Sequence, residues 1–563
     1  MNDWYYNMGL VGFIRVLDKY NIPYKKEERC ITFDSSALEN MPEYYFSSLY
    51  EEYYEPLHKR RIDSINKLLK TIEDVISLKK DLGELKKVFG EAKPLDLIKK
   101  MDEQYKRKTE YKHLSEELSK IKKNISKINK IKKIDENSTL QLQTIITSIE
   151  RLKDLFDSDY IKERFFYTNV LRVILSNNFF GQVSFLNRRL FANRSLKEFK
   201  ERYKKDYIEP VLDERNLIPD EKSLKCSVCG MYKAGENLNL SEEHLLPVGV
   251  SKVLINQYWS KNFYPMCALC KMVLFFAPLG VSHYFEHVPS PSKSYWEKKK
   301  RYLFVNGGEN VENLVNLNEN LKRLSDSENP FAELMIDYIS RVKKKSEWVL
   351  QNLMFIEFYT EYGNVTPLLN IMSLSKSFAR FFYNEHEIFR KMRRNLSIKL
   401  LTALMTSSAG WDTLSLYVVD YIKNPNSIHH IFYGAMAVEL YENYKKYWRD
   451  VDMTEKIKRV KGKLWNLYNQ GKDIRNEFIK NNQENKIKSI AYKLLNAART
   501  NNTKLFMDTI LRIYMSFDRV VPSVFLDTLN SETSLQAAAY SFISGLLGES
   551  NLEQNKKESE SDE

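Results

Sequence analysis

The sequence predicts an α+β protein that is predominantly helical, with a mixed N-terminal region, a zinc-binding insert built on four cysteines and a C-terminal helical bundle. Three observations support this class. Helical and alternating patterns mix before about residue 384, two Cys-x-x-Cys pairs interrupt them, and apolar residues recur at helical spacing afterwards. A chain of 563 residues is too long for one ordinary core, so several domains are expected.

The predicted segments follow these changes of pattern. Residues 1–225 form an α/β region that contains a basic helical hairpin at about 51–156. It is followed by a zinc-binding insert (226–270), the remaining N-terminal region with strands (271–383), the bundle (384–548) and a disordered tail (549–563). The tail is assigned because its residues offer no apolar face to bury.

The charge balance favours an anionic partner. The chain holds 87 Lys and Arg against 74 Asp and Glu, a net charge of +13 with an isoelectric point near 9.0. Nucleic acid is the first candidate and a membrane surface the second, although genome composition alone can make a sequence rich in Lys, Asn and Ile. No signal peptide is evident, and the apolar run 272–281 is shorter than the about 20 residues that span a bilayer. We therefore expect a cytoplasmic protein that does not bind a membrane.

The first 50 residues mix helix and strand. Residues 8–20 (MGLVGFIRVLDKY) predict a turn that leads into a short helix, in which Gly9 and Gly12 would let another segment pack closely. Residues 30–36 (CITFDSS) alternate and are rich in β-formers, which indicates a strand.

A basic helical hairpin is predicted next. Each helix carries an apolar stripe, and the second begins after the polar stretch 135–139, which supplies N-cap residues. The stripe residues are Leu114, Leu118, Ile121, Ile125 and Ile128 in the first helix and Leu142, Ile145, Ile149, Leu152 and Phe156 in the second. A charged hairpin of this kind is most often a solvated arm, but the excess of Lys over Glu between Lys120 and Lys133 favours contact with a phosphate backbone.

Further elements are predicted up to the C-terminal tail. An apolar helix from about residue 165 reaches a loop at 176–182 (SNNFFGQ). Residues 296–311 predict a basic segment, a strand and a Gly-Gly turn, and 353–371 predict another strand with a Gly-Asn turn. Turn signals at 407–410, 424–427 and 469–471 then divide a series of amphipathic helices, which is typical of a bundle.

Four of the five cysteines form two Cys-x-x-Cys pairs, Cys226 with Cys229 and Cys267 with Cys270. Sulfurs spaced in this way converge on one ion, and two pairs complete a tetrahedral shell with Zn–S distances of about 2.3 Å. In a chain without a secretion signal, metal ligation is a better interpretation than a disulfide framework. We therefore expect one structural Zn2+ whose binding contributes to folding.

The sequence between the two pairs also allows a catalytic hypothesis. His244 and Asn262, followed by the second pair, resemble the ββα-metal layout of His-Asn-His nucleases, in which a His activates water and an Asn orients the strand. Where that family holds a metal-binding His, this chain is apolar, and His283 and His287 follow at the wrong spacing. We therefore favour a site that keeps only the zinc-binding part of that layout and assign no catalytic residue.

Taken in order, three motifs resemble the CXXC–CXXC family of large subunits of the type I-B CRISPR effector (Cascade) complex. They are WYYNMGLVGFIRVL at 4–17, NNFFGQVSFLN at 177–187, and the pairs Cys226-x-x-Cys229 and Cys267-x-x-Cys270. The resemblance implies a non-catalytic subunit in antiviral defence. Such a subunit recognises the protospacer-adjacent motif in target DNA, stabilises the R-loop and the displaced strand, and helps recruit a helicase–nuclease.

The partners implied by the resemblance are those of a large assembly. They are guide RNA and target DNA, the backbone, 5′-handle-binding and RNA-processing subunits, the helicase–nuclease, and a small subunit similar to the chain's own C-terminal bundle. In this family that small subunit is sometimes made by internal translation, for which Met436 and Met453 are plausible starts.

The nucleic-acid contacts implied are of two kinds. In the 176–182 loop, Asn177, Asn178 and Gln182 would bond base edges, beside Gly181 and a wedge of Phe179 or Phe180; the alternative is a turn with a buried Phe pair. Backbone contacts would come from basic residues on exposed faces, namely Lys122, Lys123, Lys127, Lys298, Lys299, Lys300, Arg301, Arg393, Arg394, Lys458, Arg459 and Lys461, with Lys59, Arg60, Arg61, Arg390, Lys391, Lys456 and Lys463 as further candidates.

Two other functions stay open at this point. One is a metal-dependent nuclease centred on His244 and Asn262, which would need a loosely bound divalent ion besides the zinc. The other is a generic RNA-binding zinc protein, which would bind RNA well without assembly partners.

Overall fold

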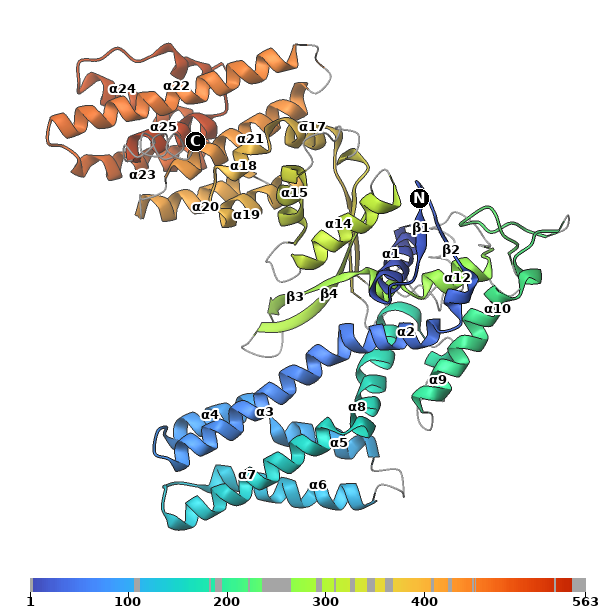
Figure 1. Cartoon of the computed structure of the whole chain (residues 1–563). Helices are drawn as coiled ribbons and strands as arrows, with labels where there is room; N and C mark the ends of the chain where they lie inside the picture. Colours follow the sequence, from blue (N-terminus) through green and yellow to red (C-terminus); the bar gives the residue numbers. More distant parts are fainter. Residues whose placement is uncertain are drawn as a thin grey trace, which may run out of the picture. The chain divides into compact units, whose positions relative to one another are not determined.

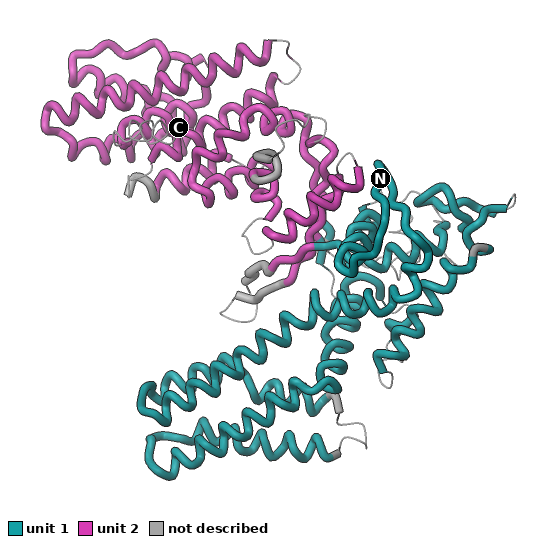
Figure 2. Tube along the Cα trace, in the orientation of Figure 1, with its two compact units in different colours: residues 1–281, 358–369 teal, residues 282–357, 370–563 magenta. Residues whose placement is uncertain are grey.

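The structure is a computed structural model. It describes residues 4–105, 112–181, 184–187, 195–220, 223–234, 265–289, 296–307, 310–324, 330–341, 350–359, 368–406, 410–423, 428–447, 450, 452–530 and 533–548. The chain divides into two compact units (Figure 2): unit 1 comprises 1–281 and 358–369, and unit 2 comprises 282–357 and 370–563. The predicted class is confirmed, because helices predominate over two small sheets.

The N-terminal helix of unit 1 packs closely against the segment that follows the last cysteine. This helix, α1 (Trp4–Lys19), lies against α12 (Ala268–Leu274) and α13 (Ala277–Gly280). A Cβ added to Gly9 would lie 2.5 Å from the carbonyl oxygen of Val273, and one added to Gly12 would lie 2.0 Å from that of Phe276. The close packing predicted for the two glycines is confirmed. The predicted turn before them is wrong, because the chain is helical from Trp4 onward.

A short hairpin follows α1. Strands β1 (Tyr24–Lys26) and β2 (Ile31–Phe33) pair antiparallel, so the strand predicted within 30–36 is confirmed. Beyond them, α2 (Met41–Leu49) and the π-helix η2 (Tyr50–Tyr54) lead into the long helix α3.

A helical arm forms the next part of unit 1 (Figure 1), and we use "the arm" for α3 to α7. Its elements are α3 (Glu55–Ile76), α4 (Leu82–Ala92), α5 (Pro94–Tyr105), α6 (Lys112–Ile125), the 3-10 turn η4 (Ser126–Lys130) and α7 (Glu136–Asp157). The predicted hairpin is confirmed as α6 and α7, which pack together. Asp135 caps α7, accepting from the Ser138 amide at 2.7 Å.

The predicted 176–182 loop is largely helical. After α8 (Asp159–Phe166), the π-helix η5 (Tyr167–Phe180) runs through most of it and ends at Gly181, whose φ is 64°. Phe179 and Phe180 are buried, and Phe180 stacks on Phe275 with ring centroids 4.4 Å apart. The helix continues because this pair is part of the core; the alternative of a buried Phe pair is therefore confirmed, in a helix rather than a turn, and neither ring is an exposed wedge.

The rest of unit 1 leads to the cysteines. Its elements are η6 (Ser184–Leu186), α9 (Leu196–Tyr203), η7 (Lys204–Ile208), α10 (Glu209–Leu212) and η8 (Glu214–Asn216).

Unit 2 begins at a four-stranded sheet with the order β3-β4-β5-β6. The strands are β3 (Ser282–Pro289), β4 (Trp296–Asn306), β5 (Met354–Tyr359) and β6 (Leu368–Ser373), the last two lying partly in unit 1, and the helices α14 (Val311–Arg323) and α15 (Pro330–Arg341) lie between β4 and β5 in the chain. The predicted strand in 296–311 is confirmed and includes the basic segment. The strand predicted before the Gly-Asn turn of 353–371 is confirmed as β5, and the segment also reaches the start of β6.

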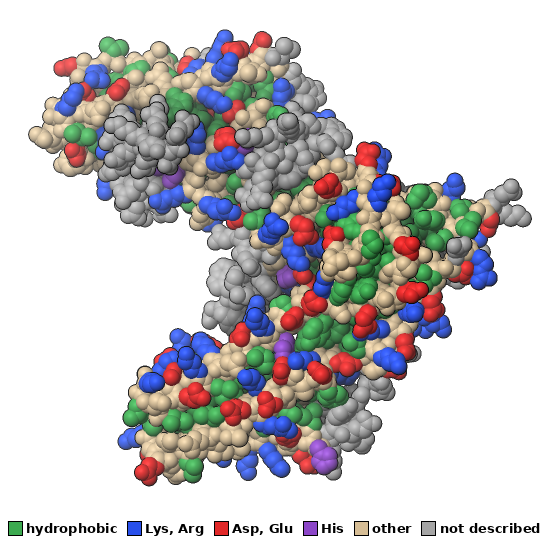
Figure 3. All heavy atoms as spheres, viewed as in Figure 1, with side chains coloured by type: hydrophobic (Ala, Val, Ile, Leu, Met, Phe, Trp, Pro, Cys, Tyr) green, Lys and Arg blue, Asp and Glu red, His purple; other side chains and the backbone are tan. Residues whose placement is uncertain are grey.

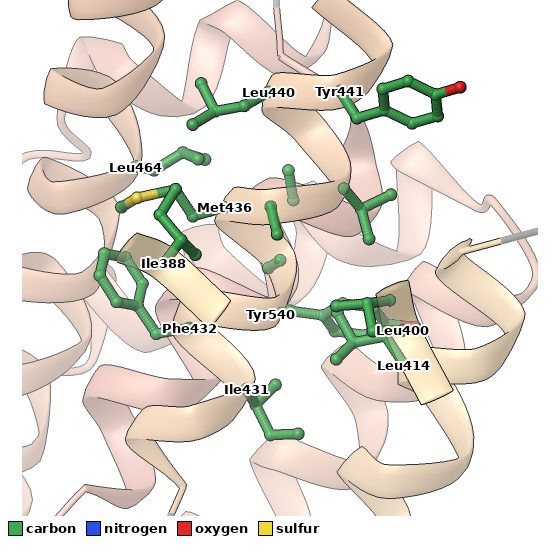
Figure 4. Packing of buried hydrophobic residues seen from close by; sticks show 14 of the residues in the cluster. Ile388, Leu400, Leu414, Ile431, Phe432, Met436, Leu440, Tyr441, Leu464 and Tyr540 are labelled. Atoms are coloured by element: carbon green, nitrogen blue, oxygen red, sulfur yellow. The ribbon is translucent and has the colours of Figure 1, made fainter. Parts of the chain in front are cut away.

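The bundle of unit 2 surrounds one apolar helix. Its helices are α17 (Lys376–Glu385), α18 (Glu387–Arg390), α19 (Arg394–Met405), α20 (Gly410–Lys423), α21 (His429–Tyr447), α22 (Met453–Lys480), α23 (Asn485–Arg499), α24 (Thr503–Met515), the 3-10 turn η10 (Ser523–Thr528) and α25 (Leu535–Leu547). In α25 every residue except Gln536 is buried, as expected of a helix surrounded by others. Figure 4 shows this core, in which Met436 of α21 lies near Leu464 of α22. Among the described residues, no helix combines the length and the apolar character needed to cross a bilayer.

A predicted turn within the bundle is wrong. Residues 469–471 lie inside the continuous helix α22, and Gly471 serves close packing against α25 instead. A Cβ added to Gly471 would lie 2.2 Å from the carbonyl oxygen of Phe542, and one added to Gly545 would lie 1.9 Å from that of Tyr468. The two helices therefore cross backbone to backbone, which only glycine permits.

This crossing predicts opposite effects for two identical substitutions in the same bundle. Gly545→Ala should lower the free energy of unfolding by about 2–3 kcal/mol, because its methyl group would overlap a backbone oxygen that has no room to move. Gly462→Ala, inside α22, should raise it by about 1 kcal/mol, because nothing lies within 4 Å of the added Cβ and alanine favours helix. Thermal unfolding of the full chain measures both, and equal shifts in the two variants would contradict the close crossing.

Candidate metal centre

The first cysteine pair lies in a tight turn. Residues Lys225 and Lys233 form an antiparallel bridge, and between them the Cys226 amide donates to the Tyr232 carbonyl at 2.9 Å. The amide of Gly230 donates to the Cys226 carbonyl, also at 2.9 Å, and Gly230 has φ +68°. This left-handed conformation, which favours glycine, bends the chain so that Cys226 and Cys229 face the same point.

The second pair lies at the start of a helix. Cys267 is the N-cap of α12, and its sulfur accepts from the backbone amide of Cys270 at 3.3 Å. Cys270 therefore lies in the first helical turn, one turn before Val273. Both sulfurs belong to buried residues. The segment before them is tied to the first pair, because the Ser227 amide donates to the Pro265 carbonyl at 2.9 Å.

The four sulfurs have the separations that a metal ion requires. All four lie within 4.8 Å of one another, and the Cys229 and Cys267 sulfurs are 3.9 Å apart. Two thiolates at about 2.3 Å from a tetrahedral zinc lie about 3.8 Å apart, whereas a disulfide requires about 2.05 Å. All five cysteines of the chain are free thiols. The cysteines therefore lie close enough to hold one metal ion, and a set of four sulfurs fits zinc.

The electrostatics show why these thiols need a cation. Hydrogen bonding from the neighbouring thiols, Cys226 first, lowers the pKa of Cys229. Hydrogen bonding to the same neighbours, again Cys226 first, raises the pKa of Cys270 together with burial. Thiols this close share protons, because they do not all ionise without a positive charge between them. A divalent cation would replace these protons and satisfy all four sulfurs at once.

The centre is connected to α1 through Tyr6. This tyrosine packs against the cysteine cluster, and burial first, then the charge of Cys270, raises the pKa of its phenol well above the usual value. The phenol therefore stays protonated, and its O–H is positioned as a donor toward the Cys270 sulfur. Donors of this kind orient a ligand and moderate its charge.

A comparison with known protein families also points to the region of the cysteines. Residues 219–282 match the model of a family described as CRISPR-associated protein (Cas_CXXC_CXXC). The matched region contains both cysteine pairs and the helices α12 and α13. No curated protein and no solved structure matched the chain. The match supports a CRISPR-associated protein, the coarser part of the resemblance seen in the sequence.

The residues of the nuclease hypothesis are only partly placed. His244 and Asn262 lie outside the described residues. His283 lies in β3, opposite Tyr302 of β4, and burial followed by the charge of Lys300 lowers its pKa to about 3. Within the described residues, the four cysteines are the group of His, Cys, Asp and Glu side chains that could hold a metal ion.

Of the residues predicted to read bases, the described part of the chain includes Asn177 and Asn178. Gln182 lies outside the described residues. Asn178 is buried, and its amide nitrogen donates to the Val173 carbonyl at 2.5 Å, one turn back in η5. The side-chain oxygen of Asn177 is buried without a hydrogen-bond partner among the described residues. In this arrangement Asn178 serves the helix rather than an exposed groove-reading loop.

The predicted backbone contacts fall into two groups, which differ in their partners. In the bundle, Lys458 pairs with Glu455 at 3.2 Å and Lys461 with Glu385 at 2.6 Å. Lys456 and Lys463 are likewise paired, with Asp450 and Asp527. Near the sheet, Arg301 lies 3.8 Å from Glu357, and Arg394 pairs with Glu333. Carboxylates of the chain itself thus neutralise much of this charge.

Some of the remaining candidates make no ion pair with any described residue. Lys122 and Lys123 are exposed at the end of α6 and, like the half-buried Lys127, make no ion pair with any described residue. Arg459 is exposed and has no ion-pair partner in the described part of the bundle. Arg393 is exposed at the start of α19, and Lys300 lies 5.4 Å from the Tyr302 ring centroid; both make further interactions with described residues. The side chains of Lys298 and Lys299, on β4, lie outside the described set.

Two residues that the sequence analysis did not select stand out in the structure. Trp465 of α22 is 37% exposed, less than two helical turns from Arg459, and Leu78 at the end of α3 is 77% exposed. For Trp465, a signal was available: with Arg459, Gly462 and Asn466 it shares an exposed helical face. Leu78 lies beyond the end of α3 at Ile76, so helical periodicity does not show where its side chain points.

The metal centre predicts what cysteine replacement should do. The purified chain should hold about one zinc, and Cys270→Ser should lose it and lower the thermal stability of unit 1, because the centre joins the turn at 226–230 to α12. Elemental analysis and thermal unfolding measure the two effects. Cys30→Ser is the control, since Cys30 is exposed and its thiol bonds to Glu27 at 3.2 Å, away from the centre. Full zinc content in Cys270→Ser would contradict the assignment.

Proposed function

We propose that the chain is the large subunit of an RNA-guided type I CRISPR surveillance complex (Cascade). In this role it recognises the protospacer-adjacent motif in target DNA, stabilises the R-loop and the displaced strand, and helps recruit the helicase–nuclease. The protein itself is not an enzyme in this proposal. Its cofactor is one structural Zn2+, held by Cys226, Cys229, Cys267 and Cys270.

The observation that carries the proposal is the family match over the metal centre. Residues 219–282 match a CRISPR-associated family, and within them four cysteines converge as the family's name requires. The centre is built into α1 and α12 rather than standing open, which favours a structural role. A net charge of +13 adds support for an anionic partner.

The division of labour in such a complex fits the character of this chain. Guide pairing carries most of the sequence information, so the protein needs mainly contacts to phosphate backbones and a short readout of the duplex. Exposed basic residues without ion-pair partners in the described structure, such as Lys122, Lys123 and Arg459, suit the first task. Exposed aromatic rings such as Trp465 suit the stacking of single-stranded bases. We propose the bundle as a surface for the displaced strand.

Internal translation would give two different products. Met453 is the first residue of α22, so a product that begins there would contain α22 to α25 as whole helices. Met436 lies in the middle of α21, buried in the core, so a product from there would begin with a broken helix. Of the two candidate starts, we propose Met453, because it respects a helix boundary.

The proposal is tested with the assembled complex. The chain is purified with its guide RNA and the proteins encoded beside it, and binding is measured to duplexes that carry a guide-matched target with randomised flanks. We expect tight binding that depends on the flank and on the guide, since the adjacent motif is read before the guide pairs. Leaving out the chain should abolish the dependence on the flank.

The same samples test the two other functions. Cleavage is measured in Mg2+ with the wild-type chain and with His244→Ala. Cutting by the chain that disappears in His244→Ala would overturn the proposal in favour of a nuclease. Tight binding of unrelated RNA by the chain alone, without flank-dependent binding of DNA, would overturn it in favour of a generic RNA-binding zinc protein.

A further inference from the structure

A leucine occupies an unusual backbone position at the end of α3. The amide of Lys79 donates to the Asp74 carbonyl at 2.8 Å and the amide of Leu78 to that of Val75 at 3.1 Å, which is the Schellman pattern that ends a helix. In this pattern the residue at the position of Leu78 is left-handed, and Leu78 has φ 58°. Glycine is the usual residue there, because a branched side chain is strained in this conformation.

The side chain of Leu78 is also in an unusual environment. It is 77% exposed, although leucine is normally buried. The apolar contact that often accompanies this pattern would join residues 74 and 79, but these are Asp and Lys. Leu78 is therefore unusual in two ways: its backbone is left-handed and its apolar side chain is exposed. The apolar contact between residues 74 and 79 that would compensate is missing. Departures of this kind concentrate at functional sites.

Leu78 lies at the same end of the arm as the connection between α6 and α7. At the other end, His58 of α3 and Asp157 of α7 are joined at 2.8 Å between Nε2 and Oδ1. From this pair, α3 extends over 18 residues to Ile76 and α7 over 21 residues to Glu136, about 27 Å and 32 Å at 1.5 Å per residue. The two helices pack along each other, so both turns lie at the same end of the arm, which we call the arm end, residues 77–81 and 120–135 (Figure 1).

The connection between α6 and α7, together with the end of α6, is rich in lysine, and Asp81 and Asp135 are the acidic residues of the arm end. The segment 120–134 holds seven lysines and no Asp or Glu, and these are Lys120, Lys122, Lys123, Lys127, Lys130, Lys132 and Lys133. None of them forms an ion pair with a described residue. Elsewhere on the arm, lysines and carboxylates are interleaved, as the face in Figure 3 shows, and pairs such as Lys67 with Glu91 form. The lysine cluster is therefore charge that the described part of the chain does not neutralise.

We propose that the arm end binds double-stranded nucleic acid, with the lysine cluster on the phosphates and Leu78 packed into the groove against a base step. This inference rests on the proposed function, of which it specifies one contact surface. Lysines without a carboxylate partner in the described structure favour a polyanion such as a phosphate backbone. An exposed leucine fixed by a helix end is suited to the groove, because apolar side chains of this size insert between base steps. The end of α3 presents the Leu78 side chain outward.

The substitution Leu78→Gly should change stability and nucleic-acid binding in opposite directions. The variant should unfold about 2 °C higher than wild type, because glycine removes the backbone strain. It should nevertheless bind less well. The probe is a duplex of about 25 base pairs and arbitrary sequence with 2-aminopurine at successive steps, mixed with the full chain. Wild type should raise the fluorescence, since inserted leucine unstacks the probe, and Leu78→Gly should lose that rise and bind about fivefold more weakly.

Two further variants make the test specific. Lys93→Gly is the matched control: Lys93 caps α4 with φ 47° on the same arm, so it should gain stability while the fluorescence rise is kept. The triple variant Lys122→Ala, Lys123→Ala and Lys130→Ala should reduce the slope of log affinity against log salt by about 2.7, because each phosphate contact contributes about 0.9.

The outcomes distinguish this inference from the large-subunit proposal. Unchanged fluorescence and salt slope in all variants would overturn the arm-end inference, while flank-dependent binding by the assembled complex would keep the larger proposal intact. A Leu78→Gly chain that binds the duplex normally but no longer retains another subunit of the complex would also overturn it, and would make the arm end a protein-docking surface. Loss of guided binding with the arm-end effects intact would overturn the larger proposal alone.

Discussion

The backbone contact between α1 and the segment 273–280 is the constraint on which the rest of unit 1 depends. A Cβ at Gly280 would lie 1.9 Å from the carbonyl oxygen of Met8, so neither side of the contact tolerates a side chain. Arg15 of α1 completes the contact by donating to the carbonyls of Leu279 and Val281 at 2.8 and 3.2 Å. Because Cys270 lies one turn before Val273, this packing fixes where the second cysteine pair stands, and Tyr6 of the same helix reaches the cluster. The metal centre is thus held by helix packing from one side and by the Gly230 turn from the other.

The parts of the fold that local chemistry determines were predictable from the sequence. The arm hairpin follows from apolar periodicity and the N-cap at Asp135, and the cysteine cluster follows from ligand spacing. The errors arose where one residue type has two uses. Gly471 and its neighbours were predicted as a turn, but the glycine permits the crossing of α22 and α25. Likewise the polar residues of 176–182 suggested a loop, while burial of Phe179 and Phe180 kept most of it helical. In both cases the deciding partner is distant in sequence, which a local pattern does not reveal.

Leu78 illustrates a different limit. The residue type, the periodicity before it and the lysines after it are all ordinary as sequence. What distinguishes it is a backbone angle of 58° combined with exposure, and both depend on how α3 ends. A sequence pattern predicts that a helix ends near this point, but it does not show that the position most suited to glycine holds a leucine. Backbone strain of this kind is therefore visible only once the hydrogen bonds of the helix end are known.

Charge is subject to a similar limit, because composition counts it without showing where it is neutralised. Lysines are abundant both in α22 and around the connection between α6 and α7, and the sequence predicts a phosphate contact for both sets. In α22 the basic residues alternate with partners that the fold supplies, including Glu385 and Asp527 from other elements. Between Lys120 and Lys133 no acidic residue interrupts the series, and no described carboxylate from the rest of the arm reaches it. An internally paired lysine has already given up part of its attraction for a phosphate, whereas an unpaired one loses only water and counterions. The segment 120–133 is thus a run of positive charge that no described carboxylate neutralises.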